Sequence, residues 1–118
     1  MPIKYTITTF FDVFNKRDMD RMADLLDEDA EFYFPKTQPL IGKDRILKFL
    51  NILFRQYPEL TFDIQRIICE GSKAAVHWTN KGRSRKNEPY QNEGATILEM
   101  ADDKITFISD FFKDTENF

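Results

Sequence analysis

The sequence from Asp18 to Pro35, DMDRMADLLDEDAEFYFP, joins a helical pattern to a strand pattern with no linker between them. In its first half, apolar residues recur at positions 19, 22, 23 and 26, which is the spacing of one helix face. After the acids at 27–29 the period becomes two, with Phe32 and Phe34 on one face and Tyr33 on the other. Acids are disfavoured at a helix C-terminus. The stretch therefore predicts a helix capped by Asp18 that ends at the acids, and then a strand from Ala30 to Phe34.

The remaining patterns predict two more helices and four long strands. The helices are expected at Ile3–Asn15 and Lys43–Tyr57, and the strands at Thr61–Cys69, Ala74–Lys81, Tyr90–Met100 and Lys104–Phe112. Helices followed by a meander of antiparallel strands define the α+β class. Because a twisted sheet curls, the third helix can fill its opening and leave a cone with an apolar interior. The length predicts a single domain over residues 1–118.

The composition restricts the function classes. The chain has 12 Phe residues, and a net charge of -3 that argues against a nucleic-acid partner. No apolar run is long enough to span a membrane, and the N-terminus lacks the apolar core of a signal peptide, so a cytoplasmic protein is expected. The single cysteine, Cys69, excludes an internal disulfide, suggests no metal site and is expected to be a small buried hydrophobe. Nothing in the sequence requires a cofactor.

Three segments carry a family resemblance: DMDRMADLLDEDAEFYFP, then PLIGKDRILKFL, then DDKITFISDFFKDTENF at the end. Their order resembles the nuclear transport factor two-like superfamily, and is most similar to its SnoaL-like and ketosteroid-isomerase-like branches. The resemblance implies a cone-shaped α+β barrel, with three N-terminal helices packed on a strongly curved, mostly antiparallel sheet. It also implies a homodimer that pairs through the outer sheet face. The fold alone does not decide the activity, because it carries several enzyme classes and non-enzymatic domains.

Ketosteroid isomerases of this superfamily use an Asp as general base, and a Tyr and a protonated Asp that hold the oxyanion of the enolate. By resemblance, these positions fall at Phe34, Phe10 and Thr96. A phenyl ring can neither abstract nor donate a proton. Ketosteroid isomerisation by that mechanism is therefore not expected.

SnoaL-like cyclases use a cavity carboxylate as acid and base, and Asp110 within FISDFF could take that role. Burial would raise its pKa and make it a usable proton carrier. The alternative is an Asp110 at the rim that pairs with a cation or faces solvent. His77, the only histidine, could shuttle protons beside Asp110, or could lie on the outer face because Val76 and Trp78 compete for the inward side.

Candidate ligand-binding residues come from the expected interior. They are Phe10, Phe14, Tyr33, Phe34, Tyr57, Trp78, Thr96, Ile108 and Phe112. Two functions remain open at this point: an isomerase- or cyclase-type enzyme acting on an apolar small molecule, and a non-catalytic ligand-binding or dimerisation module. The basic tip of the expected hairpin is interpreted as a solvated turn, with a site for an anion or an acidic partner as the alternative; its residues are Lys81, Arg83, Arg85 and Lys86.

Overall fold

The computed structural model describes residues 3–114 as three helices and six strands. The helices are α1 (Ile3–Lys16), α2 (Met19–Leu25) and α3 (Lys43–Gln56). The strands are β1 (Leu26–Tyr33), β2 (Leu40–Ile41), β3 (Thr61–Glu70), β4 (Lys73–Arg83), β5 (Pro89–Ala101) and β6 (Lys104–Phe112).

The corner between α2 and β1 forms as the sequence predicts, but the strand begins earlier. The Asp18 side chain caps α2 by accepting a hydrogen bond from the Arg21 backbone N–H at 3.2 Å. Strand β1 starts at Leu26 rather than Ala30, so the acids at 27–29 lie inside it. In this extended backbone Leu26 and Ala30 are buried while Glu28 and Asp29 stay exposed. The apolar side chains thus reach the core and the charged ones stay in water.

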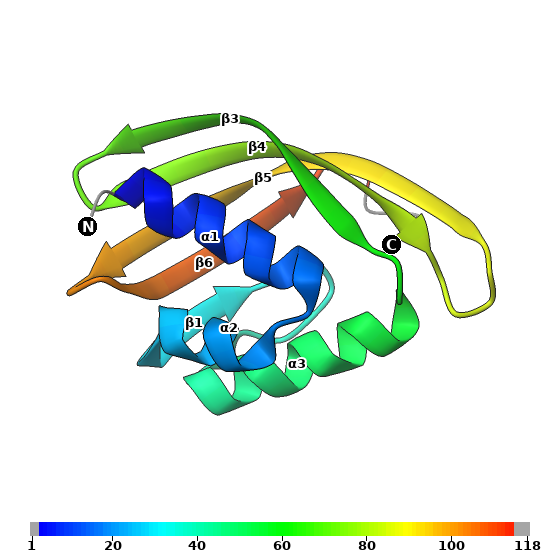
Figure 1. Cartoon of the computed structure of the whole chain (residues 1–118), viewed down its shortest axis with the longest axis horizontal. Coiled ribbons are helices and arrows are strands. Elements are labelled where there is room, and N and C mark those ends of the chain that lie inside the picture. The colour runs from blue at the N-terminus through cyan, green and yellow to red at the C-terminus, as the bar shows by residue number, and fades with distance from the viewer. Residues whose placement is uncertain (1–2, 115–118) are drawn as a thin grey trace.

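The sheet is open and has the order β2-β1-β6-β5-β4-β3. All neighbouring strands are antiparallel except β1 and β6, which run parallel (Figure 1). The register shifts between residues 64 and 66 of β3, and between residues 99 and 100 of β5. Such bulges increase the local twist and bend a strand. They accompany the strong curvature of the sheet around its helices.

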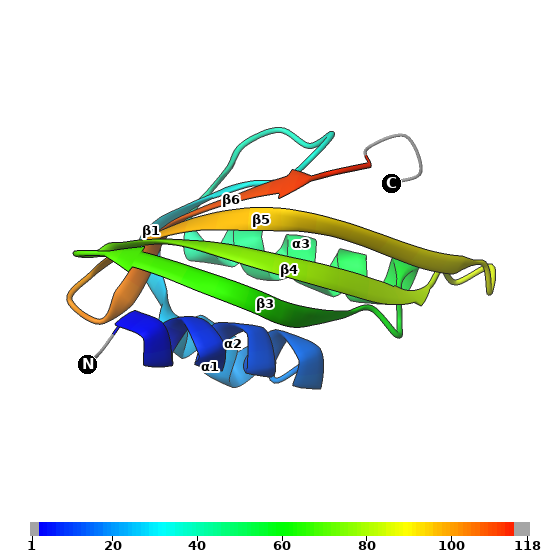
Figure 2. The ribbon, with the colours of Figure 1, turned by 90° about the horizontal axis from the view of Figure 1, so that it is seen from above.

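The three helices lie on the concave side of the sheet (Figures 1 and 2). Alternate residues of each strand point toward them, and Val76, Trp78 and Leu98 are completely buried. The core is rich in aromatic rings in edge-to-face contact, such as Phe14 and Phe62 with centroids 5.0 Å apart. The expected α+β cone with three helices is confirmed, although its sheet does not close.

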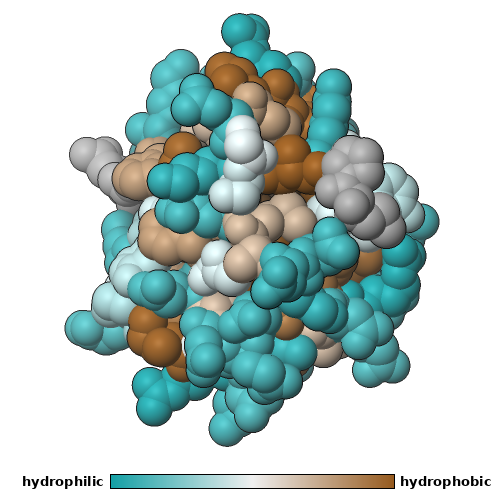
Figure 3. Space-filling view, turned by 90° about the vertical axis from the view of Figure 1, so that its left-hand side faces the viewer, coloured by the Kyte–Doolittle hydropathy of each residue, from teal (hydrophilic) through white to brown (hydrophobic). Residues whose placement is uncertain are grey.

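The two ends of the molecule differ. One end carries the β3–β4 and β5–β6 turns, and its strongly hydrophobic residues form separate patches among hydrophilic ones (Figure 3). Its depression, of about 250 Å³, is lined by Ile3, Gly71, Ser72 and residues 100–103. At the other end the long β4–β5 hairpin extends beyond the helices (Figure 2). A larger hollow, of about 550 Å³, lies at this hairpin end.

One prediction about a single residue is wrong. Cys69 is exposed rather than buried. It lies near the end of β3, the last strand of the sheet order, where residues 68–70 are all exposed.

Candidate functional site

A chain of hydrogen bonds crosses three strands on the concave face and ends at Asp110. The register places Thr96 of β5 beside both Val76 of β4 and Asp110 of β6. The Trp78 indole Nε1–H donates to Thr96 Oγ1 at 2.8 Å, and Thr96 Oγ1 donates to Asp110 Oδ1 at 2.6 Å. Trp78 is completely buried and Thr96 is 1% exposed, so the chain is fixed by packing.

The direction of this chain follows from the donor inventory. An indole N–H can only donate, so the Thr96 oxygen accepts from Trp78 and has its single proton left for Asp110. In the ionised carboxylate, Asp110 Oδ1 therefore accepts from Thr96. Oδ2, which has no such donor from Thr96, is the oxygen left to take up a proton.

Burial raises the pKa of Asp110 to about 7, and the hydrogen bond from Thr96 lowers it only in part. The ionised carboxylate has lost water and has gained a single donor in exchange. The residue as a whole keeps some contact with solvent. A carboxyl group with such a pKa exchanges its proton near neutral pH, which is unusual for Asp.

The Asp110 carboxyl faces a hollow lined by phenyl rings. The lining residues are Phe10, Phe11, Phe14, Phe32, Phe34, Leu53, Phe62 and Asp110. The sequence thus places Phe10, Phe14 and Phe34 correctly in the interior. The free volume is only about 10 Å³, however, which is the room needed by roughly one water molecule. The rings fill the expected cavity, so a larger ligand needs side chains to move.

Asp110 also lines an open groove on the other side of Phe34. This groove, about 200 Å³ in volume, is lined by Tyr33, Phe34, Pro35, Thr37, Ser109, Asp110 and Phe111. Only Phe34 and Asp110 belong to both the groove and the phenyl hollow. The Phe34 ring, packed on Phe112 with centroids 5.3 Å apart, therefore separates solvent from the interior beside the carboxyl group.

His77 does not lie beside Asp110, because the two residues occupy opposite faces of the sheet. Its register partner on β5 is Ala95, whereas Asp110 pairs with the buried Thr96. His77 Nε2 lies 2.6 Å from Glu93 Oε2, and Lys113 Nζ lies 3.5 Å from the other Glu93 oxygen. The hydrogen bond with His77, followed by the charge of Lys113, lowers the pKa of Glu93. His77 thus belongs to an outer-face ion pair, which was the alternative interpretation of its pattern.

The other candidate residues divide among three places. Trp78, Ile108 and Phe112 are core residues, and Trp78 also begins the hydrogen-bond chain. Tyr33 points to the outer face, where it donates to Glu31 Oε1 at 2.7 Å, and this hydrogen bond raises its pKa. Tyr57 lies at the end of α3, away from the phenyl hollow.

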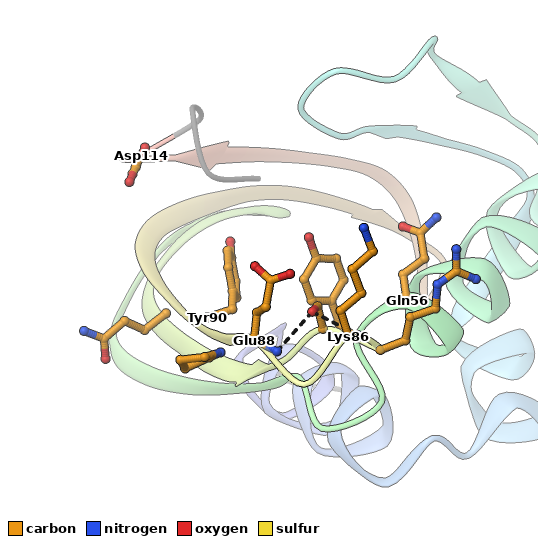
Figure 4. Close-up of a pocket in the computed structure, with 10 residues that line it drawn as sticks. Gln56, Lys86, Glu88, Tyr90 and Asp114 are labelled. Atoms are coloured by element: carbon orange, nitrogen blue, oxygen red, sulfur yellow. Dashed lines mark hydrogen bonds between the residues drawn. The ribbon is translucent and has the colours of Figure 1, made fainter.

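Tyr57 lines a hollow of about 550 Å³ at the root of the β4–β5 hairpin (Figure 4). Its ring packs against Tyr90 with centroids 5.3 Å apart, and Lys86 and Glu88 project beside them. The Arg85 backbone N–H donates to Gln56 O at 2.8 Å, which ties the hairpin to α3. The sequence analysis missed Tyr90, although a tyrosine at an inward-facing strand position after a polar turn was a usable signal.

The described residues form neither a metal-binding cluster nor a membrane-spanning helix. Within residues 3–114, no three His, Cys, Asp or Glu side chains gather closely enough to hold a metal ion. In the same range, no helix has both the length and the apolar character needed to cross a membrane.

Comparisons with known proteins agree with this geometry. The model of the SnoaL-like domain matches residues 7–108. A nuclear transport factor two-like protein of unknown function from Burkholderia pseudomallei superimposes with a TM-score of 0.91 at 16% identity, over 99% of this chain and 95% of that one. A candidate SnoaL-like polyketide cyclase from Jannaschia sp. gives a TM-score of 0.85 at 16% identity, over 94% and 85% of the two chains.

A protein with a ketosteroid-isomerase-like fold from Catenulispora acidiphila, solved in complex with trimethylamine, gives a TM-score of 0.83 at 14% identity. The comparison covers 90% of this chain and 83% of that chain. No curated protein matches significantly. The helices on an open, curved sheet define a nuclear transport factor two-like fold. Within that class, the chain belongs to the SnoaL-like domain family.

Proposed function

We propose that this SnoaL-like domain binds an apolar carbonyl compound and moves protons on it with Asp110. The observation that carries the proposal is a carboxyl group among phenyl rings with a pKa raised to about 7. A general acid–base is most effective when its pKa lies near the working pH. The named activities of structural neighbours at such low identity support only the fold.

In the proposed reaction, ionised Asp110 Oδ2 takes a proton from a carbon next to the substrate carbonyl. The C–H electron pair becomes the enolate, and Asp110 becomes the neutral acid. The same Oδ2–H then returns the proton, either to the enolate carbon or, after that carbon has attacked a second carbonyl, to the alkoxide oxygen that the attack creates. Thr96 supports each step from Oδ1, and its own proton is committed to Asp110.

Substrate reaches Asp110 from the open groove when the Phe34 ring turns aside. Phe34 is 7% exposed and borders both the groove and the phenyl hollow. Its rotation would merge the two spaces beside the carboxyl group. The shorter Phe34→Leu variant should therefore admit apolar ligands more readily than the natural chain.

The test is an NMR titration of the Asp110 carboxyl carbon, combined with a thermal-shift screen of apolar ketones. We expect a midpoint near pH 7 in the free protein and at least one ketone that raises Tm by mass action. Asp110→Asn should keep the fold but abolish exchange of the ketone's α-protons with solvent deuterium. A midpoint near pH 4, or exchange that persists in Asp110→Asn, would rule out this role.

The second candidate is a non-catalytic module, which the filled interior favours. A free volume of about 10 Å³ holds no organic ligand as it stands. If no ketone raises Tm, even in Phe34→Leu, the non-catalytic module is the better account.

We also propose that two copies pair through the outer sheet face. Two large hydrophobic side chains there, Ile68 and Phe111, are 65% and 60% exposed. An exposed apolar surface on a curved sheet is typical of an interaction site.

A further inference from the structure

Two asparagines face each other across β4 and β5, and they differ completely in their hydrogen bonds. The register pairs Asn80 with Asn92 on the concave face, at the hairpin end of the sheet. The Asn92 amide donates to the Tyr90 hydroxyl at 3.1 Å and to Asp114 O at 2.6 Å. Its oxygen accepts from the backbone N–H groups of Glu93 and Asp114. Asn92 is therefore saturated by the protein itself.

Asn80 is 3% exposed, yet neither atom of its amide makes a hydrogen bond with any of residues 3–114. The Tyr90 hydroxyl lies close to Asn80 but forms no hydrogen bond with it. Burial raises the pKa of Tyr90 to about 12, and Asn80 offsets only part of that rise. A single hydroxyl proton could serve only the Asn80 oxygen, so the Asn80 N–H groups would still have no acceptor. A buried amide without partners costs stability, and a leucine would fill the same space at no such cost.

The Tyr90 side chain connects this amide to the large hollow at the hairpin. Its ring lines the hollow (Figure 4) together with that of Tyr57. Its hydroxyl lies beside Asn80 and Asn92. The volume of about 550 Å³ falls within the range of small-molecule sites. Rotation of the Tyr90 ring would open the hollow down to the Asn80 amide.

The charges around the hollow indicate a neutral ligand. Arg85 and Lys86 line it together with Glu88 and Asp114, so cations and anions balance. The two tyrosine rings offer apolar faces to a flat molecule. Asn80 does not line the hollow as it stands, but behind the Tyr90 hydroxyl it offers an adjacent donor and acceptor, and a second amide complements that pair.

We propose that this hollow binds a neutral, flat molecule with a carboxamide or cyclic amide group, recognised by Asn80 and covered by Tyr57 and Tyr90. This site lies at the hairpin and does not depend on Asp110. It adds a second ligand class to the apolar carbonyl compound proposed above.

The experiment uses benzamide as the probe, with toluene and benzoate as controls that lack the amide or carry a charge. We expect benzamide to shift the Asn80 side-chain N–H resonances in NMR and to bind at least tenfold more tightly than either control. Asn80→Leu should weaken benzamide binding at least tenfold while raising Tm of the free protein, because it removes an unpaired polar group. The matched variant Asn92→Leu should lower Tm, because it breaks four hydrogen bonds.

Three results would overturn the proposal: no benzamide binding to the natural chain, equal binding to Asn80→Leu, or a fall in Tm for Asn80→Leu like that of Asn92→Leu. Asp110→Asn should bind benzamide normally. This variant separates failure of the amide site from failure of the proposed proton transfer.

Discussion

Burying the ionised Asp110 carboxylate costs folding free energy, because the described residues supply one hydrogen-bond donor where water would supply several. Its carboxylate receives a 2.6 Å hydrogen bond from Thr96, and burial dominates the remaining balance. Proteins retain such groups at functional sites more often than elsewhere. The cost predicts measurable effects on stability as well as on chemistry.

The first prediction concerns the pH dependence of stability. Below about pH 4 the Asp110 carboxyl is protonated in both the folded and the unfolded chain, so its full contribution is present. Between about pH 4 and 7 only the unfolded chain loses the proton, so the free energy of unfolding falls as pH rises, and it levels off above the folded pKa. Asp110→Asn should remove this loss. It should be more stable than the natural chain at pH 8 by roughly 1–3 kcal/mol, a range reduced for the residue's contact with solvent.

Urea unfolding at pH 4 and pH 8 checks this expectation. The difference between the two proteins should be small at pH 4 and largest at pH 8. An Asp110→Asn variant that is less stable at pH 8 would contradict a raised pKa.

The second prediction concerns Thr96. Thr96→Val removes the hydroxyl that donates to Asp110 Oδ1, and that hydrogen bond lowers the carboxyl pKa, so the pKa should rise above its value of about 7. It also leaves the buried Trp78 N–H without a partner, at a cost of about 1–3 kcal/mol. Titration of the Asp110 carboxyl carbon gives the pKa, and Thr96→Ser, which keeps the hydroxyl, is the control. An unchanged pKa in Thr96→Val would show that Thr96 does not set it.

At the scale of the element, β5 makes room for the Trp78 ring because it carries a glycine, Gly94, at the position beside that ring. Gly94 lies between Trp78 on β4 and Phe112 on β6. A Cβ at Gly94 would lie 2.7 Å from Trp78 Cη2 and would also collide with the carbonyl oxygen of Phe111. The missing side chain gives the indole ring the space from which it reaches Thr96.

The third prediction is that Gly94→Ala strains this part of the sheet. Overpacking should lower the free energy of unfolding by about 1–3 kcal/mol or more. It should also displace Trp78, which near-ultraviolet circular dichroism and tryptophan fluorescence would report. Ala95→Ser, on the outer face of the same strand, is the control and should change little. A Gly94→Ala protein with unchanged stability would show that the ring can move freely.

The sequence predicted the elements well because their periodicities are long and unbroken. It placed β1 four residues late, because acids at 27–29 indicate the end of a helix but are equally acceptable on an exposed strand edge. It identified Asp110 from the apolar residues around it. Asn80 could not be identified in this way, since the absence of a hydrogen-bond partner depends on strands β4 and β5 and on Tyr90 together.

At the scale of the whole molecule, the outer sheet face is the surface without a layer of helices. Tyr33 and Phe107 pack there with centroids 5.4 Å apart, near the exposed Phe111. The ion pair of His77 and Glu93 lies on the same face. Apolar residues bordered by charges are consistent with the proposed homodimer.

The fourth prediction is that the chain sediments as a dimer at micromolar concentration. Phe111→Glu should shift it to monomer, because a charge would enter the centre of the interface. Analytical ultracentrifugation measures both states, and Lys16→Glu on α1, away from the sheet face, is the control. A natural chain that stays monomeric at high concentration would refute the pairing.

The parallel pairing of β1 with β6 has a consequence for the order in which the protein assembles. Leu26 and Tyr33 take their ladder partners from Ile105 and Ser109, about eighty residues later in the chain. A ribosome must therefore translate almost the whole chain before β1 can pair with β6, whereas its other neighbour, β2, follows it directly in the sequence. Until then Phe32 and the phenylalanines of α1 have no complete sheet to pack against. The nascent chain therefore needs chaperones, or rapid folding after release, to avoid aggregation.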